Sequence, residues 1–183
     1  MTRLTAIDPE QASGKTKDLF NAVQSKLGVV PNMMRTMGNA PALLEGYLNL
    51  SGALGAGKLG LKTGNLIAMA VAESNSCNYC LSAHTYLGLN LAKIDAATLT
   101  EARDGIAKDA KTQAILQFAK LVVSKHGQLN DTDVADVKAA GVTDGEMAEI
   151  IGHVALNIMT NYFNNTAGTI IDFPVVAAHT TAV

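Results

Sequence analysis

The feature that most constrains the fold is a helical pattern that continues along almost the whole sequence. Alanine, leucine, methionine, lysine and glutamine are frequent, whereas runs of β-branched residues and the two-residue alternation of half-buried strands are scarce. Glycine and proline divide the pattern into successive segments, as at Gly28, Pro31, Gly38 and Pro41. We therefore expect an all-α, single-domain bundle of eight or nine helices.

The expected helices span about residues 9–27, 31–37, 42–54, 61–73, 77–90, 96–106, 111–125, 131–139 and 147–163. N-terminal helices then occupy residues 1–60, the core occupies 61–164, and 165–183 form a tail whose ordered part ends at Asp172-Phe173-Pro174. Segment 61–73 is apolar nearly all round, which is typical of a buried helix. The glycine-rich stretch 52–64 partly matches nucleotide-binding loops, but no strand precedes it, so we interpret it as a connection between helices.

Composition excludes several functional classes. The chain has 183 residues, 48% of them hydrophobic, which is enough for one globular core. A net charge of −2 provides no basic surface for nucleic acid, and no apolar run approaches the ~20 residues of a membrane helix. The N-terminus lacks the apolar segment of a secretory signal. Charged residues make up only 16%, which favours burial of surface between subunits, so we expect a cytoplasmic homo-oligomer.

The two cysteines of the chain, Cys77 and Cys80, are separated by two residues. A disulfide between such near neighbours closes a very short loop and stabilises the fold little, so the pair indicates redox chemistry or half of a metal site. On one continuous helix, Glu73, Cys77, Cys80 and His84 would lie in a single narrow stripe. His84 is then one turn from Cys80 and is placed to accept its proton.

These positions suggest a division of roles. If Ser76 caps the helix, the helix N-terminus favours the thiolate form of both cysteines. Cys80 is then the candidate nucleophile, His84 its base, Cys77 the thiol that closes the disulfide, and Glu73 a holder or relay of protons. Two other interpretations stay open: a zinc site, although one rigid helix cannot converge four ligands on a point, and buried cysteines that act only as small apolar residues.

The segment Glu73-Ser-Asn-Ser-Cys77-Asn-Tyr79-Cys80-Leu-Ser-Ala-His84 resembles the E-x-N-x-C-x-Y-C-x-x-x-H signature of the carboxymuconolactone decarboxylase-like superfamily. Within it, the chain is similar to the alkylhydroperoxidase D-type, peroxidase-related branch, and segments 28–32, 61–72 and 153–174 also fit. The resemblance implies an all-helical fold in a trimer, hexamer or dimer-based oligomer, without metal or flavin. It also implies a peroxidatic Cys80, a resolving Cys77, His84 as base, a hydroperoxide substrate and a dithiol reductant such as a lipoylated or thioredoxin-like protein.

The sequence departs from alkylhydroperoxidase D at two positions. Asn65 stands where that enzyme has the glutamate of its proton relay, and Tyr79 stands between the cysteines in place of histidine. We expect Glu73 to take over the relay. Two alternatives to a peroxidase are an acid–base enzyme that uses His84 and Glu73 on a small lactone or keto acid, and a non-catalytic redox sensor.

Several residues outside the motif also carry expectations. We expect His153 to be a satisfied core histidine, or else to contact the active site across a helix pair. His126 and His179 are expected to be inert. Peroxide is expected to enter a pocket beside Cys80. Three asparagines on one face of the last helix are candidates for hydrogen bonds across a subunit contact: Asn157, Asn161 and Asn164.

Overall fold

The computed structural model describes residues 1–179, and the regular secondary structure in that range is entirely helical. The all-α, single-domain prediction is therefore confirmed, with nine helices in these residues. No helix among them is long and apolar enough to cross a membrane. The elements are α1 (Gly14–Leu27), α2 (Asn32–Met37), α3 (Pro41–Gly55), α4 (Gly60–Ser74), α5 (Asn78–Asn90), α6 (Ala96–Arg103), α7 (Ala110–Ser124), α8 (Asp131–Ala139) and α9 (Asp144–Ala167).

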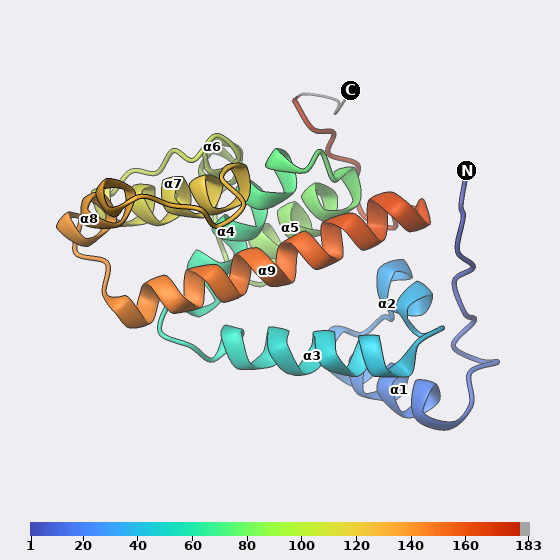
Figure 1. The fold of residues 1–183 in the computed structure, drawn as a ribbon. Coiled ribbons are helices and arrows are strands. Elements are labelled where there is room, and N and C mark those ends of the chain that lie inside the picture. The colour runs from blue at the N-terminus through green and yellow to red at the C-terminus, as the bar shows by residue number, and fades with distance from the viewer. Residues whose placement is uncertain (180–183) are drawn as a thin grey trace.

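Helix α4 forms the centre of the fold, as its apolar sequence predicts. It packs against α5, α6, α7 and α9, and every residue from Gly64 to Glu73 is buried. Figure 1 shows the long helix α9 crossing the whole molecule, with α1–α3 on one side and α4–α7 on the other. Fully buried side chains such as Ile67 and Leu81 each contribute about 1.5–3 kcal/mol to stability.

Local sequence signals set most helix ends. The α1 helix begins at Gly14 and not at Pro9, because Asp8 accepts the backbone N–H of Glu10 and holds residues 9–11 in a turn. It ends as predicted at Gly28, which adopts a left-handed conformation with φ 76°. The predicted capping box of Thr143 and Glu146 is present, and it starts α9.

The chain breaks between α4 and α5, as the separate segments expected at residues 61–73 and 77–90 predict. Asn75 Nδ2 donates to the Val71 carbonyl at the end of α4, and Ser76 has a positive φ of 49°. Cys77, and not Ser76, is the N-cap residue of α5. Glu73 therefore lies on a different helix from Cys80, and the single stripe expected for one continuous helix does not form.

The C-terminal segment is ordered beyond Pro174, contrary to our expectation. Residues 175–179 return to the start of α5, where the backbone N–H of Val176 donates to Ser82 Oγ and that of Ala178 donates to Asn78 Oδ1, both at 2.9 Å. These polar side chains on α5 supply the hydrogen bonds that an extended segment lacks within itself. Of the expected tail, residues 180–183 lie outside the described part of the chain.

Candidate functional site: the cysteine pair at the start of α5

Cys77 and Cys80 face each other in the first turn of α5. The sulfur of Cys77, the N-cap residue, accepts the backbone N–H of Cys80 at 3.4 Å. The Cys77 thiol donates to the Cys80 sulfur, with the two Sγ atoms 2.8 Å apart, and both cysteines are free thiols. A disulfide bond is about 2.05 Å long, so the pair can close with a small movement.

The surroundings of the two cysteines favour ionisation of Cys80 over Cys77. Burial opposes the Cys80 thiolate, but the hydrogen bonds from Cys77 and Asn164, with smaller contributions from the nearby polar side chains of Asn161 and Thr160, outweigh it and lower the pKa of Cys80 below its usual value. The pKa of Cys77 is raised, because its proton is held by Cys80 and its side chain is buried. Cys80 is therefore the more acidic thiol of the pair, and the Cys77 thiol donates a hydrogen bond to its sulfur.

Helix α9 supplies a polar wall opposite Cys80. Asn164 Nδ2 donates to the Cys80 sulfur at 3.3 Å, and Asn161 Oδ1 accepts from Asn75 Nδ2 at 3.0 Å. The side chain of Asn157 lies on the same helix but donates to the backbone carbonyl of His153. Asn161 and Asn164 thus act within the chain and not across a subunit contact, which corrects our expectation. The sequence shows that these asparagines share one face of α9, but it does not show which element packs against that face.

The residue between the cysteines joins three distant segments. Tyr79 Oη accepts the backbone N–H of Met33 at 3.0 Å, and its ring meets Phe173 edge to face at 5.9 Å. Asp172 Oδ2 accepts the backbone N–H of Asn32 at 2.7 Å. Desolvation is the main cause of the raised pKa of Tyr79, so it stays a neutral phenol. Tyr79 therefore anchors α5 between α2 and the segment after α9.

His84 lies one turn beyond Cys80, and its ring is held by Asn65. Asn65 Nδ2 donates to the His84 carbonyl, so Asn65 Oδ1 faces the ring and accepts from His84 Nδ1 at 3.0 Å. Nδ1 then carries the proton of the neutral ring, and Nε2 has the free lone pair. Burial and the nearby His153 lower the pKa of His84 to about 4. Asn65 thus orients the histidine without contributing a charge.

His153 packs against α4 next to this pair. A Cβ on Gly64 would lie 2.7 Å from Cε1 of the His153 ring. The ring is buried, and its Nε2 has no hydrogen-bond partner among the described residues. Desolvation lowers the pKa of His153, despite the opposing charge of Glu149. It is therefore not the satisfied core histidine that we expected first, and its influence on His84 agrees with the second expectation.

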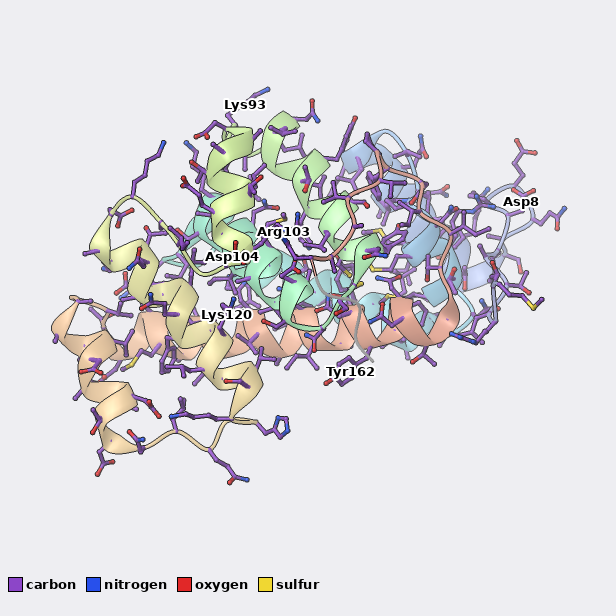
Figure 2. All side chains as sticks on the ribbon, turned by 90° about the horizontal axis from the view of Figure 1, so that it is seen from above. Asp8, Lys93, Arg103, Asp104, Lys120 and Tyr162 are labelled. Atoms are coloured by element: carbon purple, nitrogen blue, oxygen red, sulfur yellow. The ribbon has the colours of Figure 1, made fainter. Side chains whose placement is uncertain are left out.

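The Glu73 carboxylate is paired with Arg103, a residue that sequence reasoning missed. Arg103 Nε donates to Glu73 Oε2 at 2.7 Å, and Nη2 lies 2.6 Å from the same oxygen. Glu73 Oε1 accepts the backbone N–H of His179 at 2.7 Å. His179, expected to be inert, thus ties the C-terminal segment to α4 through its backbone. Figure 2 shows Arg103 in the middle of the molecule, whereas Tyr162 lies on the outer side of α9.

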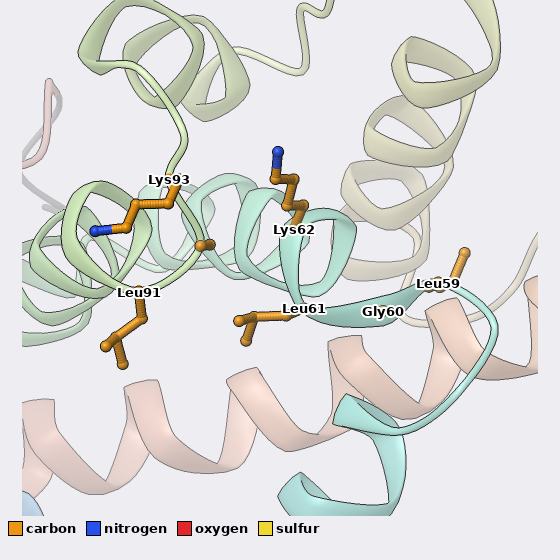
Figure 3. Close-up of a pocket in the computed structure, with 7 residues that line it drawn as sticks. Leu59, Gly60, Leu61, Lys62, Leu91 and Lys93 are labelled. Carbon is orange, nitrogen blue, oxygen red and sulfur yellow. The ribbon is translucent and has the colours of Figure 1, made fainter.

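Two surface hollows lie away from the cysteines. One, of about 570 Å³, is formed by the start of α4 and the residues after α5, and Figure 3 shows Leu61 and Leu91 near each other in it. The other, of about 300 Å³, lies between α7 and α9. Neither is lined by Cys80, so the expected pocket beside it stays a prediction. Within residues 1–179, no three histidine, cysteine or acidic side chains lie close enough together to hold a metal ion.

The chain is similar to several solved structures. An alkylhydroperoxidase AhpD core, a peroxidase-related protein from Ralstonia eutropha JMP134, has a TM-score of 0.82 at 22% identity, over 93% of this chain and 92% of that chain. A peroxidase-related protein from Silicibacter sp. TM1040 has a TM-score of 0.78 at 23% identity, over 93% and 94%. The debrominase Bmp8, in a cysteine-to-alanine variant with 2,3,4-tribromopyrrole, has 0.78 at 20% identity, over 94% and 92%.

At these identities the solved structures establish the fold alone. No curated protein matches the chain significantly. The model of the carboxymuconolactone decarboxylase family matches residues 41–122, which contain both cysteines, His84, Glu73 and Arg103. Over these residues the chain is therefore similar to the carboxymuconolactone decarboxylase family, and it has the alkylhydroperoxidase D-like fold.

Proposed function

We propose that the protein is a thiol peroxidase that reduces a hydroperoxide through a dithiol–disulfide cycle. The observation that carries the proposal is the 2.8 Å hydrogen bond from the Cys77 thiol to the Cys80 sulfur. It supports Cys80 as the attacking thiolate and leaves the proton on Cys77, the thiol that acts second. The similarity to the carboxymuconolactone decarboxylase family and the fold are compatible with this activity, but both also accommodate other reactions.

The proposed reaction has two steps. The Cys80 thiolate attacks the terminal oxygen of the hydroperoxide, the O–O bond breaks, and the leaving oxygen takes the Cys77 proton to give an alcohol or water. Cys80 is then a sulfenic acid. The Cys77 thiolate attacks its sulfur, forms the disulfide and releases hydroxide, which takes a proton from solvent. The peroxide gains two electrons, and the dithiol loses two.

His84 is the base that we assign to the resting enzyme. Its ring is neutral near pH 7, and the hydrogen bond to Asn65 leaves Nε2 able to accept a proton from the Cys80 thiol. The relay role of Glu73 stays a prediction. Both of its carboxylate oxygens already accept hydrogen bonds, and we therefore infer that Glu73 holds the segment 175–179 in place against α5.

Recycling requires a second dithiol, because the cycle ends with the disulfide. We propose a protein reductant of the lipoylated or thioredoxin-like kind, a homo-oligomeric enzyme and a cytoplasmic location. The low share of charged residues and the exposed Leu61, Leu91 and Tyr162 support assembly. A reducing compartment supports a cysteine pair that starts its cycle as thiols.

The test is a thiol titration of the full chain before and after one equivalent of hydrogen peroxide or an organic hydroperoxide, followed by intact mass measurement. We expect rapid loss of both thiols and a mass decrease equal to two hydrogen atoms. Two thiols that persist for hours would overturn the peroxidase proposal. That result would favour an acid–base enzyme that uses His84 and Glu73, although in the structure these two residues bind different partners, Asn65 and Arg103.

Reductive debromination is a second candidate, favoured by the similarity to the debrominase Bmp8. The same dithiol supplies the two electrons: an aryl bromide and two thiols become the debrominated ring, a disulfide and hydrogen bromide. Incubation with 2,3,4-tribromopyrrole, with bromide release as the readout, separates this reaction from peroxide reduction. Bromide release together with thiols that are inert to peroxide would replace the first proposal with the second.

A further inference from the structure

Two buried amide atoms next to Cys80 have no hydrogen-bond partner in the part of the chain that the structure describes. They are Nδ2 of Asn161 and Oδ1 of Asn164. Asn161 is completely buried and Asn164 is 3% exposed. An unpaired buried donor or acceptor costs about 1–3 kcal/mol. Two such atoms beside one sulfur therefore indicate a place for a ligand.

Hydrogen bonds determine which end of each amide is free. Asn75 Nδ2 donates both to the Val71 carbonyl and to Asn161 Oδ1, each at 3.0 Å, so the amino group of Asn161 is its free end. Asn161 also lies near the thiol without a hydrogen bond to it, since it is among the polar side chains that lower the pKa of Cys80. Asn164 uses its amino group on the Cys80 sulfur at 3.3 Å, so its carbonyl oxygen is the free end.

We propose that Asn161 and Asn164 bind the O–OH group of the substrate, an inference that rests on the proposed peroxidase function. The O–H of a hydroperoxide donates to Asn164 Oδ1, which directs the terminal oxygen toward the thiolate. Asn161 Nδ2 donates to the other oxygen, where negative charge develops as the O–O bond breaks. When the Sγ–O bond forms, the electron pair of the O–O bond passes to this leaving oxygen, which takes the Cys77 proton.

This arrangement also defines the substrate class. The site contains one free donor and one free acceptor beside a nucleophilic sulfur, which complements a molecule with an O–H bond next to a second oxygen. Cys80 is 3% exposed, so little room exists for bulk at the reacting oxygen. Hydrogen peroxide and small alkyl hydroperoxides meet both requirements.

Asn157 provides a matched control on the same helix. It is also a buried asparagine of α9, one turn before Asn161, but its amino group donates to the His153 carbonyl and not toward Cys80. Replacement of each asparagine by leucine keeps the side-chain volume similar and removes the amide. Loss of packing or of one amide hydrogen bond within the chain affects all three variants, whereas loss of the peroxide site affects only Asn161→Leu and Asn164→Leu.

The experiment compares two reactions of the same thiol in the full chain. Rate constants for thiol loss are measured by rapid quench and mass spectrometry, with hydrogen peroxide and with iodoacetamide, which requires only an accessible thiolate. We expect the peroxide-to-iodoacetamide ratio to fall about 10- to 100-fold in Asn161→Leu and in Asn164→Leu, and to stay within about threefold in Asn157→Leu. Equal ratios in all four proteins, or an equal fall in Asn157→Leu, would overturn the inference.

Two further readouts keep the test decisive. Where a leucine variant does not fold, Asn161→Asp retains the oxygen that faces Asn75 and replaces the amino group by a carboxylate oxygen that cannot donate, and the same fall in the ratio is expected, since the iodoacetamide rate accounts for the effect of the added charge on the thiolate. A wild-type protein that reacts with peroxide no faster than free cysteine contradicts the peroxidase proposal itself. Fast wild-type reaction with an unchanged ratio in the Asn161 and Asn164 variants contradicts only the assignment of the two amides.

Discussion

Arg103 and Glu73 form a buried ion pair that also fastens the C-terminal segment to the core. Arg103 Nη2 lies 2.6 Å from Glu73 Oε2, and the two side chains are 10% and 8% exposed. The same Nη2 donates to the Ala177 carbonyl at 2.7 Å, and Glu73 Oε1 accepts the backbone N–H of His179. The pair thus connects α4, α6 and the segment that crosses the start of α5.

Loss of one partner of this pair is expected to destabilise the fold strongly. Arg103→Met leaves the Glu73 carboxylate buried without its cation, and we expect the free energy of unfolding to fall by about 3–5 kcal/mol. Urea denaturation followed by far-UV circular dichroism measures the change. Lys138→Met, which removes the exposed pair with Asp144, is the control and is expected to cost less than about 1 kcal/mol. Similar decreases in the free energy of unfolding in both variants would show that burial does not make the Glu73–Arg103 pair more stabilising than an exposed pair.

Glu73→Gln separates positioning from proton relay. If Glu73 only positions residues 175–179, this variant becomes more sensitive to proteolysis near the C-terminus, while Cys80 reacts with peroxide at a rate close to that of the wild type. Limited proteolysis with mass analysis and the thiol-loss assay provide the two readouts. A pH-dependent fall in the peroxide rate with an intact C-terminal segment would instead establish the relay.

The two cysteines are expected to fail in different ways when replaced by serine. Cys80→Ser removes the thiolate, so peroxide leaves the remaining thiol unreacted on the wild-type time scale. Cys77→Ser retains the nucleophile but cannot form the disulfide, so oxidation stops at a Cys80 sulfenic acid that dimedone traps as a mass adduct. Dimedone adducts on Cys77 in Cys80→Ser at the wild-type rate would reverse the assignment.

Stability is expected to fall in mild acid because of His84. Burial and His153 lower the pKa of His84 from 6.5 to about 4, so between these values the unfolded chain binds a proton that the folded chain does not. The free energy of unfolding therefore decreases as the pH falls, by about 2 kcal/mol between about pH 7 and pH 5. His153 acts in the same direction. Urea titrations should show a shallower pH dependence in His84→Gln and no such flattening in His126→Gln.

Gly64 is expected to tolerate no side chain because α4 and α9 approach each other there. A Cβ at this position would lie 2.7 Å from the buried ring of His153, so we expect Gly64→Ala to lower stability by about 1–3 kcal/mol. Gly52→Ala is the control, since it lies within α3 with nothing within 4 Å of the new Cβ, and it is expected to raise stability by about 0.5–1 kcal/mol. Thermal melts of both variants measure the two effects: a lower melting temperature in Gly64→Ala indicates steric overlap with His153, and a higher one in Gly52→Ala indicates the better helix propensity of alanine.

Much of the local structure could be predicted from the sequence, because it depends on neighbours along the chain. Helical periodicity, Gly28 and the Thr143 capping box located the helix ends to within about five residues. The break before Cys77 was harder to interpret, since Asn75 and Ser76 allow either a bent helix or two separate helices. Hydrogen bonding of Asn75 to Val71 and Asn161 selects two helices, and it separates Glu73 from the cysteines.

By itself, the sequence determined the class of fold, the buried helix α4 and the candidate cysteine pair, because these follow from periodicity, apolar composition and the spacing of Cys77 and Cys80. Only the tertiary structure decided what surrounds that pair. The contact of Asn164 with Cys80 spans 84 residues, and the Arg103–Glu73 pair spans 30. Such contacts depend on how helices pack across one another, which no local pattern of residues specifies. Polar side chains of α9 therefore help to lower the pKa of Cys80, although the sequence of that helix shows only a row of polar residues.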